Sequence, residues 1–216
     1  MITIKSGIQS MATRGRPPAF DRDNALDKAL GLFWERGYDN TSMAELSAAM
    51  KLNPPSIYAA FGGKEALFDE VIAHYNKHHG TLIWADLDRF KHPKDATRHV
   101  LVASANAYTR EDTPHGCLVV LAAPQENSNH ATVNQTLCSH RRSVTKTLRN
   151  LYAEGQRRGH IPRNANIDTM ATYYATVQIG MSIQARDGAT REELIAVADA
   201  AMTTWPNLTS TSLARR

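Results

Sequence analysis

Apolar residues recur at helical spacing along most of the chain. Within residues 22–36 they stand three or four positions apart, which is the period of an α-helix with one buried face. Asp21 can cap the start of this helix and Gly37 can end it. No segment alternates apolar and polar residues for long enough to suggest a half-buried strand. The sequence therefore predicts an all-α protein.

Two short helices are expected after the first, separated by a tight turn. Thr41 or Ser42 can cap the second helix, and Glu45 stands three residues after Ser42, at the spacing of a capping box. Residues 51–53 form the turn, and Asn53 can cap a third helix that opens with two prolines. Proline is tolerated there because its missing N–H would have no intrahelical partner. This order predicts a helix-turn-helix.

The remaining pattern is helical to near the C-terminus. A fourth helix is expected from Lys64, and five more at about residues 94–110, 116–126, 130–158, 167–187 and 191–205, which gives about nine helices. We divide the chain into a flexible basic N-terminal arm (1–19), a three-helix helix-turn-helix domain (20–66), a second helical domain (67–206) and a disordered tail (207–216).

The outward residues of the third helix suggest contact with DNA. Ile57 and Phe61 take its inward positions, which leaves the hydroxyls of Ser56 and Tyr58 outside, among short side chains. A helix with this surface can enter a major groove about 12 Å wide, while helix starts nearby offer N–H groups to phosphates. The candidate DNA-binding residues are Arg14, Arg16, Thr41, Ser42, Lys51, Asn53, Pro54, Pro55, Ser56, Tyr58, Ala59 and Lys64.

Basic charge adds one feature to this interpretation. The formal net charge of +4 permits a polyanionic partner, but the excess is not concentrated in the helix-turn-helix. Arg14 and Arg16 precede the first acidic residue, in a segment with the form of arms that lie in narrow minor grooves. The alternative is a solvated leader without a role in binding.

Residues 32–72 resemble the N-terminal domain of the TetR/AcrR family of one-component bacterial regulators. Each matching residue is weak evidence alone, but the ordered set at this spacing is specific. The set comprises Gly37, Tyr38, Thr41, Ser42, Met43, Ala44, Leu46, Ser56, Ile57, Tyr58, Phe61, Lys64, Glu65, Ala66, Leu67 and Phe68. One departure is Lys51, where the family commonly has a turn glycine. A left-handed backbone there would cost a lysine about 1 kcal/mol.

The resemblance implies that the second helical domain binds a ligand and forms a homodimer. A dimer is also expected on physical grounds. One short helix contacts only a few base pairs, so two helix-turn-helix domains are needed to recognise a palindromic operator. The last two long helices would form the interface as a four-helix bundle, unless they only close the core of a monomer. The expected interface residues are Met170, Tyr174, Val177, Met181, Leu194, Val197 and Ala201.

The second helical domain offers three candidate sites for a signal: an effector pocket, a reactive thiol and a metal site. The expected residues of an effector pocket are Trp84, Tyr108, Cys117, Tyr174 and Met181. Cys117 stands at an expected helix start, where the helix dipole would lower the pKa of its thiol and allow it to sense oxidants or electrophiles. The alternative is a small buried apolar residue. His115 and Cys117, with Cys138 and His140, suggest a soft-metal site only if their helices converge; we expect no bound metal.

Several classes of protein are disfavoured. The chain has no glycine-rich phosphate loop, nucleophile elbow or H-E-x-x-H motif, so we expect neither an enzyme nor a cofactor. No apolar run is long enough to span a membrane, and we expect a cytoplasmic protein. The favoured function is a DNA-binding regulator, a repressor released from operator DNA by a small-molecule effector. The alternatives are a helical interaction or adaptor protein, and a thiol- or metal-responsive regulator using Cys117 and Cys138.

Overall fold

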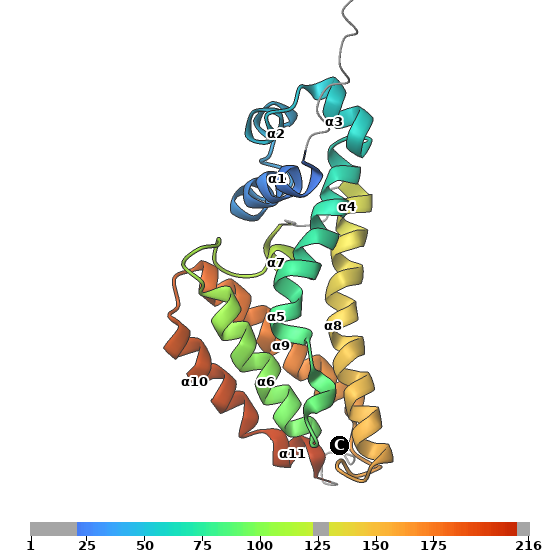
Figure 1. Cartoon of the computed structure of the whole chain (residues 1–216). Helices are drawn as coiled ribbons and strands as arrows, with labels where there is room; N and C mark the ends of the chain where they lie inside the picture. Colours follow the sequence, from blue (N-terminus) through green and yellow to red (C-terminus); the bar gives the residue numbers. More distant parts are fainter. Residues whose placement is uncertain (1–20, 123–129, 211–216) are drawn as a thin grey trace, which may run out of the picture.

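The computed structural model describes residues 21–122 and 130–210, and the regular elements in these ranges are helical. At one end of the molecule lie α1 (Arg22–Arg36), α2 (Met43–Met50) and α3 (Pro54–Phe61). From this end α4 (Lys64–Tyr75) runs into the rest of the chain, beside α8 (Figure 1). The all-α prediction and the N-terminal three-helix domain are confirmed.

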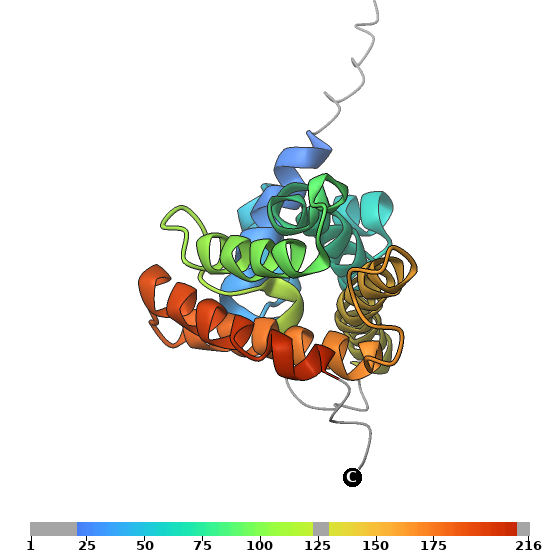
Figure 2. The ribbon, with the colours of Figure 1, turned by 90° about the horizontal axis from the view of Figure 1, so that it is seen from below.

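The second part of the molecule is a helical bundle. A π-helical turn (Asn76–Gly80) continues α4, and α5 (Thr81–Trp84) and a 3-10 turn (Leu87–Arg89) follow. The bundle then comprises α6 (Pro93–Tyr108), α7 (Leu118–Leu121), α8 (Ala131–Arg157), α9 (Ile167–Arg186), α10 (Arg191–Met202) and α11 (Trp205–Thr209). Seen from below, α9 and α10 lie side by side, and α6 packs on both (Figure 2).

Side-chain caps start the first three helices where the sequence predicts them. The Asp21 carboxylate accepts a hydrogen bond from the Asn24 N–H at 3.1 Å. The Asn53 side-chain oxygen accepts one from the Ser56 N–H at 2.8 Å. Each cap satisfies an N–H group that the helix itself leaves without a partner. These local bonds fix the start of α3 and with it the residues that the helix presents outward.

Two clusters of buried apolar side chains hold the fold together. The first joins α1–α4 to α7 and to the start of α8, through residues such as Phe33, Phe68, Leu118 and Leu137. The second lies among α6 and α8–α11. The helix-turn-helix therefore shares its core with α7 and α8, beyond the boundary at residue 66.

The structure corrects two expectations about helix ends. The helix expected at 116–126 begins only at Leu118, because Gly116 has a φ of +82° that no helix accommodates, and its described part ends at Leu121. Residues 207–210 of the expected disordered tail are ordered: α11 extends to Thr209 because Trp205 is buried and packs edge-on against Tyr152, with ring centroids 5.7 Å apart. Residues 123–129 and 211–216 lie outside the described ranges. Within those ranges, no helix combines the length and the apolar character needed to cross a bilayer.

Candidate nucleic-acid interface and internal cavity

The outward face of α3 carries an aromatic side chain that the fold does not use. Ile57 and Phe61 are 0% and 4% exposed and anchor the helix in the first apolar cluster. Tyr58, between them in sequence, is 55% exposed. Pro54, Pro55 and Ala59 are also exposed, and Ser56 is partly exposed. The short side chains around Tyr58 leave the backbone of α3 accessible, as insertion into a groove requires.

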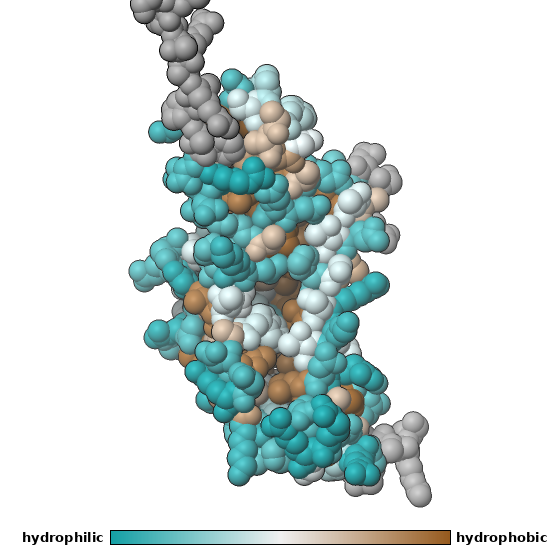
Figure 3. Space-filling view, turned by 45° about the vertical axis from the view of Figure 1, so that its right-hand side comes forward, coloured by the Kyte–Doolittle hydropathy of each residue, from teal (hydrophilic) through white to brown (hydrophobic). Residues whose placement is uncertain are grey.

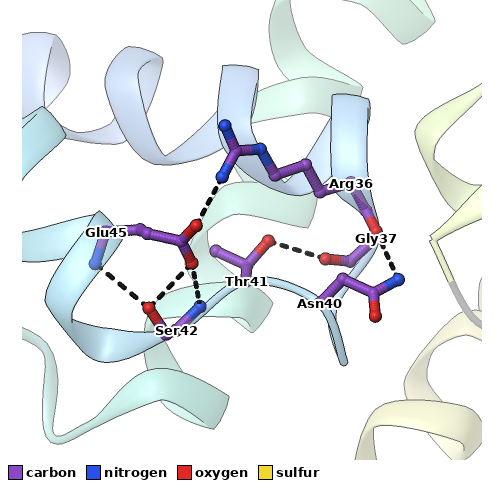
Figure 4. A network of polar contacts seen from close by, with 6 residues as sticks. All are labelled: Arg36, Gly37, Asn40, Thr41, Ser42 and Glu45. Atoms are coloured by element: carbon purple, nitrogen blue, oxygen red, sulfur yellow. Dashed lines mark hydrogen bonds and ion pairs between the residues drawn. The ribbon is translucent and has the colours of Figure 1, made fainter.

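The loop before α2 is held by a network of polar contacts, shown in Figure 4. Ser42 and Glu45 form the predicted capping box: the Glu45 carboxylate accepts from the Ser42 N–H at 2.8 Å, and Ser42 Oγ accepts from the Glu45 N–H at 3.2 Å. Arg36 lies 2.5 Å from the same carboxylate. These hydrogen bonds, with Arg36, lower the pKa of Glu45. The network joins α1 to α2 and fixes the angle between them.

This network corrects the role expected for Thr41. The side chain of Thr41 is buried, and its hydroxyl donates to the Gly37 carbonyl oxygen at 2.7 Å. It therefore holds the turn after α1 and is not accessible to a phosphate. Ser42 is exposed, but its N–H is already bound to Glu45. The unpaired N–H groups at this helix start belong to the first turn of α2 itself.

Lys51 and Lys64 hold different positions at the edges of the helix-turn-helix. Lys51 is exposed and ends α2 with a left-handed backbone, φ 54° and ψ 38°, a conformation that glycine adopts without strain. Lys64 opens α4, and its ammonium lies 4.1 Å from the ring centroid of Tyr38. Partial burial lowers the pKa of Lys64, while Asp39 and Glu45 oppose that shift. Arg14 and Arg16 lie outside the described residues.

A cavity of about 270 Å³ lies inside the second part of the molecule. Its walls come from the end of α4, from residues 76–84, and from α6–α9, and Figure 3 shows brown apolar side chains in a depression among teal and white ones on one face of the molecule. The lining residues are Tyr75, Asn76, Gly80, Ile83, Trp84, Tyr108, Cys117, Val119, Val120, His140, Arg141, Ser143, Val144, Thr147, Gln178 and Ile179. A mostly apolar lining with a few polar groups is typical of small-molecule sites.

The cavity brings together three of the five expected pocket residues, Trp84, Tyr108 and Cys117. Tyr174 and Met181 do not line it; both are buried in the second apolar cluster, where Tyr174 packs against Tyr152 and Trp205. Sequence reasoning missed the wall that α8 supplies. A signal was available, since residues 140, 141, 144 and 147 share one helical face. That face mixes polar and apolar residues, so hydrophobic periodicity alone does not identify it.

Cys117 lies on the cavity wall in a protonated state. The Tyr75 hydroxyl donates to Cys117 Sγ at 3.3 Å, and the Cys117 N–H donates to Ser182 Oγ at 2.8 Å. Burial raises the pKa of the thiol, although the hydrogen bond from Tyr75 and the charge of Arg141 act in the opposite direction. The expected lowering by a helix dipole is therefore wrong: α7 has four residues, and desolvation outweighs its dipole.

The histidines and cysteines do not converge on a metal site in the described ranges. Cys117 and His140 line the same cavity, but Cys138 does not. The rings of His74 and His78 are in tilted contact, with centroids 4.4 Å apart and an interplanar angle of 47°, and His74 Nε2 lies 2.7 Å from Asp27 Oδ1. No group of three or more His, Cys, Asp or Glu side chains in residues 21–122 and 130–210 could hold a metal ion.

The expected dimer interface is only partly at the surface. Met170, Tyr174, Met181, Leu194 and Ala201 are buried within the single chain, in the second apolar cluster, so they are not available to a partner. Val177 is partly exposed and Val197 is 44% exposed. The outer face of α9 and α10 carries further apolar or small residues that sequence reasoning missed. They are Tyr173, Gly180, Ile183, Ala196 and Ala200.

The fold and the exposed face of α3 define a helix-turn-helix DNA-binding protein with a second, helical domain. The model of the tetR family of bacterial regulatory proteins matches residues 25–71, and that of the tetracyclin repressor-like C-terminal domain matches residues 96–194. The chain belongs to the TetR family of transcriptional regulators.

Individual relatives match over nearly the whole chain. It is 36% identical to the HTH-type transcriptional repressor ComR of Escherichia coli over 201 residues, 91% of this chain and 94% of ComR. It is 32% identical to the repressor BdcR of the same species, over 85% of this chain and 88% of BdcR. A cysteine-substituted form of the TetR family regulator CifR, solved in complex with 26-bp double-strand operator DNA, superimposes with a TM-score of 0.85 at 40% identity. That match covers 88% of this chain and 100% of CifR.

Proposed function

We propose that this regulator is a repressor that binds a palindromic operator as a homodimer and leaves it when a small effector fills the cavity. The protein would act in the cytoplasm, without catalysis. The observation that carries the proposal is the exposed face of α3, with Tyr58 outside while its neighbours Ile57 and Phe61 are buried. The CifR match supports it, because that relative was solved on double-strand operator DNA. Repression is inferred from the names of ComR and BdcR.

The outer face of α9 and α10 supports a homodimer. Ile183 and Val197 are each 44% exposed, and small residues around them, such as Gly180 and Ala196, allow close approach of a second copy. Two helices from each chain would form a four-helix bundle. Such a bundle fixes the separation of the two α3 helices, which must match the spacing of half-sites in the operator.

The short helix α7 provides a route from the cavity to the DNA-binding domain. Val119 and Val120 line the cavity, and the carbonyl oxygen of Ala122, just beyond them, accepts from the Tyr38 N–H at 3.1 Å. On the other side, Arg186 of α9 donates to the Trp34 carbonyl oxygen at 2.7 Å. If α7 can take two placements, an effector that binds one of them more tightly favours that placement. The helix-turn-helix, which contacts α7, then moves with it.

Selection from a random DNA pool tests this function. The purified protein is incubated with the pool at physiological salt, and bound sequences are recovered and read. One palindromic consensus is expected, bound by two chains per site. Capture without a consensus would contradict the proposal and favour an adaptor that kept a helix-turn-helix as a structural corner. A matched variant of the exposed α3 face, Tyr58→Ala, should bind the consensus more weakly while remaining folded.

Thiol response is a second candidate, carried by the position of Cys117 on the cavity wall. A soft electrophile inside the cavity would meet its sulfur beside the Tyr75 hydroxyl. The raised pKa leaves little thiolate near pH 7, so reaction with electrophiles free in solution would be slow. A molecule held in the cavity beside the sulfur would react in preference to them. The test is release of operator DNA by a soft electrophile. Loss of this release in Cys117→Ser, with retention in Cys138→Ser, would establish the thiol response.

A further inference from the structure

The cavity has one permanently charged residue in its lining. Arg141 contributes a guanidinium from α8, and the lining contains no aspartate or glutamate. Arg141 Nη1 donates to the Val119 carbonyl oxygen at 3.1 Å. Within residues 21–122 and 130–210, no carboxylate forms an ion pair with it. Among the residues that the structure describes, the guanidinium is thus a cation at a cavity wall without a carboxylate partner.

This arrangement leaves binding capacity in the guanidinium. Arginine has five N–H donors in a planar fork, suited to a carboxylate with two oxygens. The backbone of α7 uses one side of that fork. Arg141 is only partly exposed, and a partly desolvated cation without an anion is less stable than one that is paired. The site therefore favours a ligand that brings a negative charge.

The titratable neighbours of Arg141 do not cancel its charge. Burial raises the pKa of the Tyr75, Tyr108 and Cys117 side chains, so all three stay protonated and neutral near pH 7. Burial lowers the pKa of His140, which keeps its ring neutral as well, although Asp69 opposes this shift. The lining thus carries positive charge, which the Arg141 guanidinium supplies. An anion would meet donors there and no competing carboxylate.

The rest of the wall is apolar. Ile83, Trp84, Val144 and Ile179 face the same space as Arg141. We propose that the effector is a small monocarboxylate with an apolar body, whose carboxylate binds Arg141. This rests on the proposed function, in which the cavity holds an effector. A single cation matches one negative charge, so a phosphate dianion would be left partly uncompensated, and the volume of about 270 Å³ suits a small molecule.

The contact with Val119 gives the carboxylate a consequence for α7. A ligand carboxylate that draws the guanidinium toward itself lengthens or breaks the hydrogen bond from Arg141 Nη1 to the Val119 carbonyl oxygen. α7 is four residues long, and the carbonyl of Ala122 beyond it binds Tyr38 of the DNA-binding domain. Recruitment of Arg141 by the ligand therefore releases the cavity end of α7 and changes its support of the helix-turn-helix.

Matched pairs of ligands test this inference on the full-length protein. The probes are benzoate, phenylacetate, cinnamate and octanoate, each beside its primary amide of nearly equal shape, and binding is measured by calorimetry and melting temperature without DNA. At least one carboxylate should bind at least tenfold more tightly than its amide. Arg141→Gln should weaken the binding of that carboxylate by about 10- to 100-fold and leave the affinity for the amide unchanged. Arg142→Gln, an exposed neighbour with the same charge change, should leave both unchanged.

The outcomes separate this inference from the function on which it rests. Equal binding of amides and carboxylates, binding of no carboxylate, or an undiminished affinity in Arg141→Gln would overturn it. Melting curves of the variants without ligand show whether each is folded, and Arg141→Lys, which keeps the charge but loses the fork, should retain part of the affinity. In a second arm, the bound carboxylate should release wild-type protein from selected DNA. Failure to select any operator would count against the proposed function and leave the ligand measurement standing.

Discussion

The main-chain N–H of Tyr38 donates a hydrogen bond of 3.1 Å to the carbonyl oxygen of Ala122. Tyr38 lies in the loop that connects α1 to the helix-turn-helix, and Ala122 ends α7 beside the cavity. The preceding residue, Gly37, has φ 79° and ψ 172°, a backbone region that is essentially restricted to glycine. This hydrogen bond is one of the contacts that join the helix-turn-helix domain to the second helical domain, beside the one from Arg186 to the Trp34 carbonyl oxygen.

Gly37→Ala should destabilise the protein by about 1–3 kcal/mol. A Cβ at this position would also lie 3.3 Å from the Ala122 carbonyl oxygen, so the contact between Tyr38 and α7 would have to shift. The free energy of unfolding by urea measures the effect. Gly31→Ala, in the interior of α1 with nothing within 4 Å of the added Cβ, should instead stabilise by about 0.5–1 kcal/mol. Equal effects of the two variants would contradict the role given to Gly37.

Lys51→Gly should stabilise the protein by about 0.5–1 kcal/mol. The left-handed backbone at Lys51 strains a residue with a Cβ, and glycine removes that strain while adding some entropy to the unfolded chain. If the ammonium binds a phosphate, the plot of log K against log salt concentration should also become less steep, with the magnitude of its negative slope smaller by about 0.9. Chemical denaturation and salt titration of operator binding measure the two effects. Lys91→Gln, at an exposed lysine outside the helix-turn-helix, should change neither.

Tyr58→Ala should weaken operator binding by about 1–3 kcal/mol and change the free energy of unfolding by less than about 0.5 kcal/mol. The side chain is 55% exposed and lies outside the core, so its removal costs little in the free protein. Fluorescence anisotropy with the selected operator gives the affinity. Tyr58→Phe removes only the hydroxyl and so distinguishes its contribution to operator affinity from that of the ring. A large loss of stability in either variant would show that the ring supports the fold rather than the reading of DNA.

Ile183→Asp combined with Val197→Asp should separate the proposed dimer into folded monomers. Both side chains are 44% exposed on the outer face of α9 and α10, where a second copy would bury the new charges without partners. Sedimentation and circular dichroism measure mass and helix content, and operator affinity should fall with the mass. Leu82→Asp, at another exposed apolar residue, should leave the dimer intact.

Alkylation of Cys117 should be slow at pH 7 and should keep accelerating above the ordinary cysteine pKa of about 8.5. Only the thiolate reacts, and burial raises the pKa of this thiol, so the thiolate fraction at neutral pH is smaller than that of a free cysteine. Rates of iodoacetamide labelling across pH, in a Cys138→Ser background, measure this. A labelling rate that levels off below pH 8 would show that the thiol is activated instead.

The helix-turn-helix followed from the sequence because its signals are local. Asp21, Ser42 and Asn53 cap helices within three residues of themselves, and Ile57 and Phe61 mark the buried face of α3 by their spacing alone. Sequence thus determined the N-terminal domain, the outward face of α3 and the family.

Long-range packing decided the rest. Helical periodicity finds an apolar face but does not say whether that face meets its own chain or a partner, so Met170 and Leu194 looked like interface residues although both are buried in the second apolar cluster. Cys117 is packed against Tyr75 and Ser182, which are far from it in sequence, and burial there raises the pKa of its thiol, although the hydrogen bond from Tyr75 opposes the shift. The pairing of Arg141 with the Val119 carbonyl is likewise a contact between separate helices. Local hydrogen bonds and spacing determined the helix-turn-helix domain, and only the tertiary structure decided which side chains are buried, exposed or left to bind a ligand.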